Sequence, residues 1–273
     1  MARLRAPAPL GASTRQARNR SDPNFMLSLA RGLAVIRAFD ETDAALPVAE
    51  IARRASMSRA AARRCLYTLE RLGYAGGANG AYELTPKVLM LGNAYLASTR
   101  VARAAQPVLE SVSERLQESC SLSVLDGTDI VYVARAAMRR ILSIGISVGT
   151  RLPAYCTSMG RVMLASLDDK EQVALLSRID LKAQTPRTIT DRQALRTELR
   201  RVRTAGFALV DQELEIGLRS IAVPVRSRDT VVAAINVGVH AARVDLRTMT
   251  RQYVPVLREA AERIGNAMGT TLR

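Results

Sequence analysis

The sequence VAEIARRASMSRAAARRCLYTLERLGYAGGANGAYEL, residues 48–84, determines the fold of the first part of the chain. Two short helical patterns lie either side of a break at Ala55–Met57, and a two-stranded hairpin with an Asn79-Gly80 turn follows. Asn-Gly favours such a turn because both central residues must take positive φ. This order of elements predicts a winged helix-turn-helix, a motif that places one helix in the major groove of DNA.

The second helix of the pair has an apolar inner stripe and a basic outer face. Ser58 is a preferred N-cap, and Gly73 is typical of the position just past a helix end. The inner stripe follows three- and four-residue steps and consists of Ala62, Cys65, Leu66, Leu69 and Leu72. On the outer face, short alanines let the backbone approach base edges, and arginines match guanine edges and phosphates.

This outer face, together with the hairpin, is the predicted DNA contact. A solvated basic face on an ordinary helix is the alternative, but the preceding helix, the break and the hairpin together favour DNA binding. The expected DNA-binding residues are Ser58, Arg59, Ala60, Arg63, Arg64, Tyr67 and Asn79.

Composition agrees with a DNA-binding protein of two domains. The chain has 273 residues, which supports about two domains, and its net charge of +15 favours a polyanionic partner. No apolar run approaches the ~20 residues that a membrane span needs, and no secretion signal is expected. The three cysteines have no metal or redox spacing and suit a reducing cytoplasm.

Periodicity divides the chain into four segments. Residues 1–25 are predicted to be a disordered basic tail. Residues 26–84 form the DNA-binding domain, whose first helix, 28–39, is expected to turn Leu29, Leu33, Ile36 and Phe39 inward, and whose Pro47 suits the first turn of the next helix. Residues 85–100 are predicted to be a linker helix. Its excess of apolar residues indicates packing against a second subunit.

Residues 101–273 are predicted to form one α+β domain. Strands are expected at 121–125, 130–134, 141–146, 220–225 and 231–239. Helices are expected at 101–119, 158–166, 169–178, 192–204 and 246–268. Within the strand at 231–239, Asn236 is expected to face away from Ile235 and Val237, because side chains alternate along a strand.

An enzyme is the rival class, and the sequence argues against it. A Cys or Ser nucleophile needs a histidine base, and the chain holds only His240, which is expected in an exposed loop. One histidine and scattered cysteines cannot assemble a zinc site. We therefore expect no catalytic residue, no metal and no cofactor. A DNA-packaging protein would explain the charge, but not a large apolar second domain with polar interior positions.

Five segments of the chain resemble the IclR family of bacterial transcriptional regulators. They are SLARGLAVIRAFD (28–40), RRCLYTLERLGY (63–74), YELTPKVLMLG (82–92), LPAYCTSMGRVMLASL (152–167) and DQELEIGLRSIAVPVR (211–226). The first segment and AYCTSMGR (154–161) resemble most the branch that controls protocatechuate and 4-hydroxybenzoate genes of the β-ketoadipate pathway. An IclR-type regulator of an unrelated carboxylic-acid pathway is the alternative.

The resemblance implies an architecture and a set of partners. The N-terminal winged helix would bind a palindromic operator, and the C-terminal domain would have a GAF-like fold that holds a small carboxylate. The protein would be a homodimer or a dimer of dimers, joined partly through the linker helix, and would activate or repress its genes.

The resemblance also implies where the effector binds. The segment matching AYCTSMGR and two strands contribute Ala154, Tyr155, Cys156, Ser158, Met159, Gly160, Ser220, Asn236 and Gly238. The residues themselves support a polar site, because Ser158 and Gly160 lie at a predicted helix N-terminus, where free N–H groups favour a carboxylate. In the alternative interpretation these residues bind no effector: Thr157 or Ser158 caps the helix, and Asn236 forms hydrogen bonds within the protein.

Overall fold

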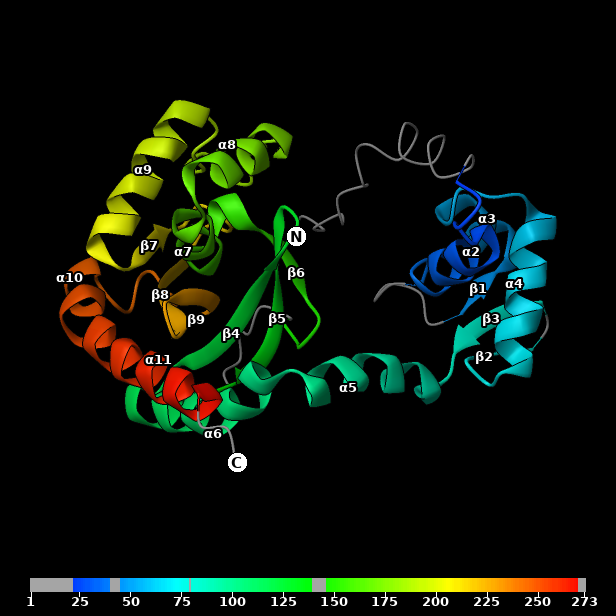
Figure 1. Ribbon diagram of the computed structural model, residues 1–273, viewed down its shortest axis with the longest axis horizontal. Coiled ribbons are helices and arrows are strands. Elements are labelled where there is room, and N and C mark those ends of the chain that lie inside the picture. The colour runs from blue at the N-terminus through cyan, green and yellow to red at the C-terminus, as the bar shows by residue number, and fades with distance from the viewer. Residues whose placement is uncertain (1–21, 40–44, 79, 139–145, 270–273) are drawn as a thin grey trace. The chain divides into compact units, whose positions relative to one another are not determined.

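The structure is a computed structural model that describes residues 22–39, 45–78, 80–138 and 146–269. The chain divides into two compact units, residues 1–93 and 94–273, with the division inside helix α5 (Leu89–Ser98) (Figure 1). Nearly all of the predicted tail, Asn79, and the strand predicted at 141–146 except its last residue lie outside the described residues.

The smaller unit is the predicted winged helix-turn-helix. Its three-stranded sheet has the order β1-β3-β2, and Ala78 pairs with Ala81 across the hairpin turn. Val35, Ile51 and Leu66 lie at the centre of its core. In chain order the elements are α2 (Leu27–Ile36), β1 (Leu46–Pro47), α3 (Val48–Arg54), α4 (Arg59–Arg71), β2 (Ala75–Ala78), β3 (Ala81–Leu84) and the 3-10 helix η1 (Pro86–Val88).

Local backbone chemistry places α4 as predicted. The Ser58 hydroxyl accepts a hydrogen bond from the Ala61 N–H at 3.2 Å, and Gly73 follows the helix with a φ of +77°. Two details of the prediction are wrong. Leu72 was predicted to belong to the buried inner stripe of α4, but it is the C-cap and is 54% exposed, because the buried stripe ends with the helix. Pro47 pairs in β1 as the extended residue before α3 and is not in its first turn.

Helix α2 buries a different face from the predicted one. Val35 and, just after the helix, Ala38 are buried in the core, whereas Leu29 and Leu33 are 59% and 47% exposed. Ile36 and Phe39 are partly buried against the core, as predicted. Helix α2 packs on α4, and its buried residue, Val35, lies in its last turn. An apolar stripe is thus left uncovered within this unit.

The larger unit is built on a six-stranded antiparallel sheet in the order β6-β5-β4-β9-β8-β7. Its strands are β4 (Ser119–Asp126), β5 (Asp129–Ala136), β6 (Arg151–Pro153), β7 (Ala208–Asp211), β8 (Leu218–Ser227) and β9 (Thr230–His240). The strands β6 and β7 are short edge strands that were not predicted. The overall class is the expected α+β fold, with a GAF-like larger unit.

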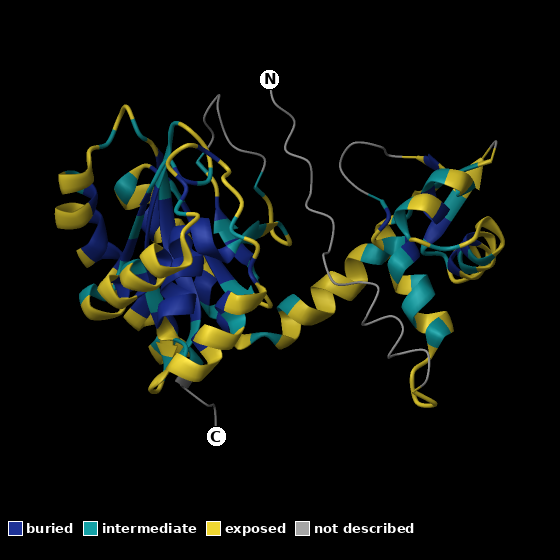
Figure 2. Ribbon diagram, turned by 90° about the horizontal axis from the view of Figure 1, so that it is seen from above, coloured by how far each residue is buried: buried dark blue, intermediate teal, exposed yellow. Residues whose placement is uncertain are grey.

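Helices cover both faces of this sheet, and the buried residues concentrate between the layers (Figure 2). One face packs against α6 (Arg100–Leu116) and the C-terminal run of α10 (Leu246–Thr248), the π-helical η3 (Met249–Tyr253) and α11 (Val254–Gly269). The other face packs against η2 (Ala154–Cys156), α7 (Ser158–Ser166) and α9 (Arg192–Ala205), with α8 (Asp169–Arg178) beside them.

Strand alternation separates the two faces. Ile235 and Val237 of β9 lie in the core with α6 and α11, and Asn236 between them faces the opposite side, as predicted. No helix of the described residues has the length and hydropathy that crossing a membrane requires.

Candidate DNA-binding face and ligand cavity

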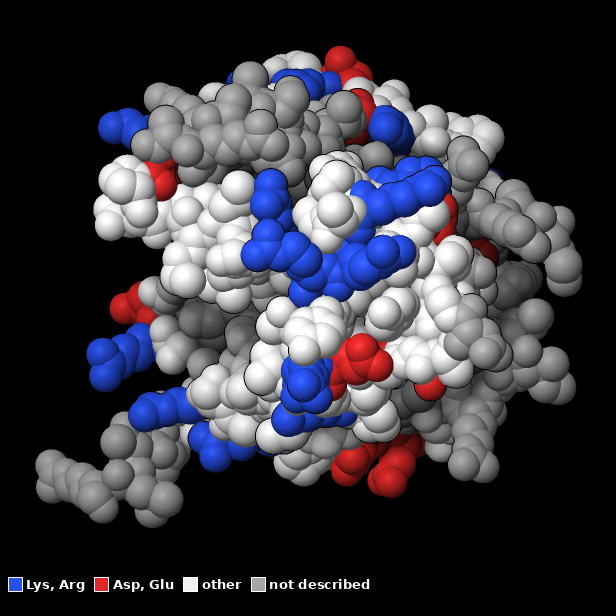
Figure 3. Space-filling view, turned by 90° about the vertical axis from the view of Figure 1, so that its right-hand side faces the viewer, with Lys and Arg blue, Asp and Glu red and all other residues white. Residues whose placement is uncertain are grey.

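The outer face of α4 is exposed along its length. Arg59, Ala60, Arg63, Arg64 and Tyr67 are all exposed. Lys and Arg side chains gather on the side of the molecule shown in Figure 3. Within the described residues, none of the three arginines in this set forms an ion pair, so their charges remain available to an external anion.

Two neighbouring interactions shape this face. The Arg71 guanidinium lies 5.6 Å from the centroid of the Tyr67 ring, and its Nε donates to the Tyr67 hydroxyl at 3.3 Å, which holds the ring. On α3, Arg53 and Arg54 both pair with Glu50, and the hydrogen bond from Arg53 contributes most to lowering the Glu50 pKa to about 2. Glu50 thus offsets part of the charge on α3, whereas Arg59, Arg63 and Arg64 of α4 have no carboxylate partner in the described residues.

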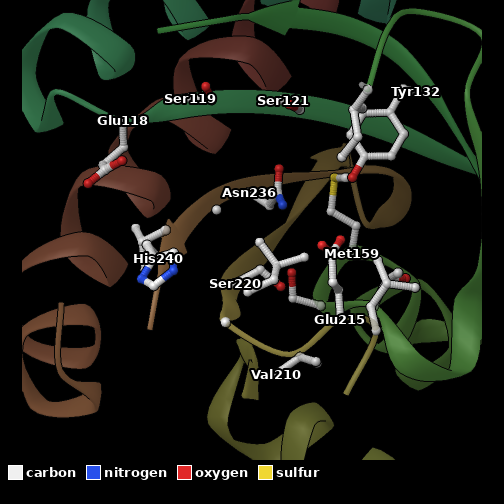
Figure 4. A pocket seen from close by; sticks show the side chains of 18 of the residues that line it. Glu118, Ser119, Ser121, Tyr132, Met159, Val210, Glu215, Ser220, Asn236 and His240 are labelled. Atoms are coloured by element: carbon white, nitrogen blue, oxygen red, sulfur yellow. The ribbon is translucent and has the colours of Figure 1, made fainter. Parts of the chain in front are cut away.

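A cavity of about 800 Å³ lies in the larger unit, on the sheet face that carries α7. It occupies the part of this face where the apolar packing against α7 and α9 ends, and residues 214–218 of the β7–β8 connection line it. Figure 4 shows Tyr132 and Met159 on one side of the cavity, and Glu118 and His240 on the opposite side.

The floor of the cavity is a polar row across neighbouring strands. Arg135 of β5 pairs with Ser121 of β4, and Ser121 pairs with Asn236 of β9. Ser220 of β8 pairs with Gly238 of β9 in the adjacent row. Directly paired residues lie on the same face of a sheet, so these residues line one polar surface.

The N-terminus of α7 faces this surface. Thr157 is its N-cap, and the hydroxyl of Thr157 accepts from the Gly160 N–H at 3.2 Å. Ser158 follows, 1% exposed, and its hydroxyl has no hydrogen-bond partner within the described residues. Because the first N–H groups of a helix lack intrahelical partners, this end of α7 attracts an anion.

Further polar groups on the cavity wall are also without side-chain partners in the described part of the chain. They are the Asn236 amide, the Ser220 hydroxyl and the Tyr132 hydroxyl. Burial raises the pKa of Tyr132 to about 12, so its hydroxyl stays protonated and can donate. Buried polar groups in proteins are normally hydrogen-bonded, which makes a polar ligand the natural partner for this set.

The structure brings six of the nine predicted effector residues to the cavity wall: Cys156, Ser158, Met159, Ser220, Asn236 and Gly238. Ala154, Tyr155 and Gly160 do not line it. A Cβ on Gly160 would lie 2.1 Å from the Ala154 carbonyl oxygen, so these two positions allow η2 and α7 to pack closely. The Tyr155 hydroxyl donates to the Lys182 carbonyl at 2.5 Å.

Sequence reasoning missed Tyr132 and Arg135. Residues three apart in a regular strand face opposite sides, but a register shift between Leu122 and Ser123 makes Val133 an extra residue in β5. Both side chains therefore face the cavity, and no sequence pattern indicated the bulge. The prediction that His240 lies in a loop is also wrong, since it ends β9 and lines the cavity.

The chemistry of the cavity suits binding rather than catalysis. Burial raises the pKa of the Cys156 thiol to about 12, which keeps it protonated and unreactive. In the part of the chain that the structure describes, no three His, Cys, Asp or Glu side chains gather in a way that would hold a metal ion.

Comparison with known proteins agrees with this geometry. Residues 28–76 match the IclR helix-turn-helix domain, and residues 93–266 match the C-terminal domain of bacterial IclR transcriptional regulators. The Pca regulon regulatory protein of Pseudomonas putida is 50% identical over 88% of this chain and 83% of its own length. The p-hydroxybenzoate hydroxylase transcriptional activator of Acinetobacter baylyi is 35% identical over 89% of this chain and 92% of its own length.

A solved structure is similar over both units. The IclR homolog of Microbacterium hydrocarbonoxydans, complexed with 4-hydroxybenzoate, is 28% identical, with a TM-score of 0.78 over 89% of this chain and 100% of its own. The matched families and relatives are transcriptional regulators and not enzymes, as the sequence predicted. This chain belongs to the IclR family of bacterial transcriptional regulators.

Proposed function

We propose that this regulator responds to a small organic acid of aromatic catabolism, which binds inside the cavity of the larger unit. One observation carries the proposal: the buried Ser158 hydroxyl faces the cavity at the N-terminus of α7 without a partner. The Pca regulatory relative and the 4-hydroxybenzoate complex support this class of acid. Protocatechuate, 4-hydroxybenzoate and β-ketoadipate are the candidate effectors, and an acid of an unrelated pathway is the alternative.

The binding mode follows from the cavity wall. The effector's carboxylate accepts hydrogen bonds from the Ser158 hydroxyl and from free N–H groups of the first turn of α7. Met159 and Leu214 cover its apolar body, while Ser220 and Asn236 bind a hydroxyl or keto group. An acid that lacks the matching group leaves polar atoms unpaired, at a cost of about 1–3 kcal/mol, so the site discriminates between related acids.

The regulator acts in the cytoplasm on a palindromic operator, as a homodimer or a dimer of dimers. Support comes from apolar side chains that neither α2 nor α5 buries, namely Leu29, Leu33, Leu89, Met90, Leu91 and Tyr95. Exposed apolar side chains that recur along a helix are typical of a protein interface. A two-fold symmetric protein reads two half-sites, which matches the symmetry of a palindrome.

Replacing Arg63 or Tyr67 by alanine is expected to weaken operator binding while the fold is retained. A lost bidentate arginine–guanine contact costs about 1–3 kcal/mol, and a dimer loses it in both half-sites. Fluorescence anisotropy with a DNA fragment selected by the wild-type protein measures the effect. Arg200→Ala, which removes another exposed arginine, on α9 of the larger unit, is the control. Unchanged affinity in both test variants would contradict the assignment of α4.

Ser158→Ala and Asn236→Ala are each expected to weaken effector binding and to leave operator binding intact. Each change removes a hydrogen-bonding group whose loss costs about 1–3 kcal/mol. Calorimetry on the full chain with protocatechuate, 4-hydroxybenzoate and β-ketoadipate measures the affinity. The control is Ser166→Ala at the exposed far end of α7. The proposal fails if none of the three acids binds, or if both variants bind like the wild type.

Leu91→Glu is expected to weaken the dimer, because a charge then replaces an apolar side chain at the proposed interface. Sedimentation velocity at micromolar concentration, with and without operator, measures the oligomeric state. Val173→Glu is the control, because Val173 is a similarly exposed apolar residue on α8 of the larger unit. A wild-type monomer under both conditions would refute the dimer.

A further inference from the structure

Arg135 is a cation on the cavity wall that lacks an anionic partner. One of its guanidinium nitrogens donates to the Ser121 hydroxyl at 3.1 Å, and the side chain is half-buried. No carboxylate of the described residues pairs with it, and residues 139–145 contain no Asp or Glu. The other arginine on the wall, Arg243, is paired with Glu118.

An arginine in this setting is suited to an anionic ligand. A partly buried charge is costly unless it is paired, and a lone hydroxyl does not neutralise it. Desolvation lowers the pKa of Arg135, but an arginine remains cationic at neutral pH. The planar guanidinium matches a carboxylate in two-point geometry, with a strong charge-assisted hydrogen bond at each point.

Arg135 and the N-terminus of α7 occupy different positions along the cavity. Figure 4 shows Met159 of α7 on the same side of the cavity as Tyr132, which pairs with Ser123. Arg135 pairs with Ser121, two residues further along β4. Two residues of a strand span roughly 6–7 Å, more than a single carboxylate covers. The cavity therefore has two separate positions that attract an anion.

We infer that Arg135 binds a second acidic group of the effector and makes the site selective for a small dicarboxylic acid over a monocarboxylic one. This inference rests on the proposed function, in which the first carboxylate lies at the N-terminus of α7. Ser121 positions the guanidinium, and Asn236 lies in the same row of the sheet, where its amide can bind the same end of the effector.

Calorimetry on the full chain with a matched pair of acids tests the inference. β-Ketoadipate and levulinate share the same keto chain, but levulinate lacks one carboxylate. The wild type is expected to bind β-ketoadipate more tightly. Arg135→Gln keeps an N–H donor for Ser121 and removes the charge. It is therefore expected to weaken the binding of β-ketoadipate about tenfold or more and to leave the affinity for levulinate unchanged. Arg226→Gln, an exposed change on β8, is the control.

The outcomes separate the two proposals. The two-acid site is refuted if Arg135→Gln lowers the affinity for both acids equally, or for neither. It is also refuted if the wild type binds 4-hydroxybenzoate more tightly than β-ketoadipate. In each of these cases the proposed effector cavity still stands. If no acid of the panel binds, the proposed function itself fails. Operator binding and thermal melting verify that the variant is folded. Ser121→Ala provides a second variant, which is expected to weaken only β-ketoadipate, by a smaller factor.

Discussion

The buried ion pair between Arg161 and Glu213 is the interaction on which the cavity depends. Arg161 extends from α7, contacts Glu213 at 2.5 Å and donates to the Tyr155 carbonyl of η2 at 3.0 Å. Glu213 also accepts from the Ile189 N–H at 3.0 Å. Removing one partner of such a pair costs about 3–5 kcal/mol, because the other charge is left buried alone. The pair thus fixes the N-terminus of α7 relative to the β7–β8 connection, and both line the cavity.

The sheet forms the remaining wall of the cavity, and the character of its side chains changes along that face. Where α7 and α9 cover it, its side chains are apolar, as at Ala222 and Ala234, and form a closed core. Beyond that cover the same strands present Ser121, Asn236 and Ser220, which would be poor core residues and suit a polar ligand. A single sheet face therefore serves both as the hydrophobic support of α7 and as the floor of the cavity.

The features predicted correctly from the sequence depend on neighbouring residues, whereas the features that were missed depend on contacts between distant segments. The N-cap Ser58, the hairpin turn and the alternation around Asn236 each depend on a few adjacent residues, and the structure follows them. The contribution of Arg135 depends on a β-bulge that only strand pairing creates. The packing role of Gly160 depends on its close approach to Ala154, which no spacing reveals.

A regulator of this kind requires that effector and operator binding be coupled. Coupling free energies between two sites are typically about 1–3 kcal/mol, and they are reciprocal. The most direct test is the operator dissociation constant of the full chain, measured by anisotropy without effector and with a saturating acid that calorimetry has shown to bind. Coupling of this size predicts a shift of about 5-fold to 150-fold in the operator dissociation constant, in either direction, and a matching shift in effector affinity when operator is bound. An operator dissociation constant that stays the same in saturating effector would contradict it.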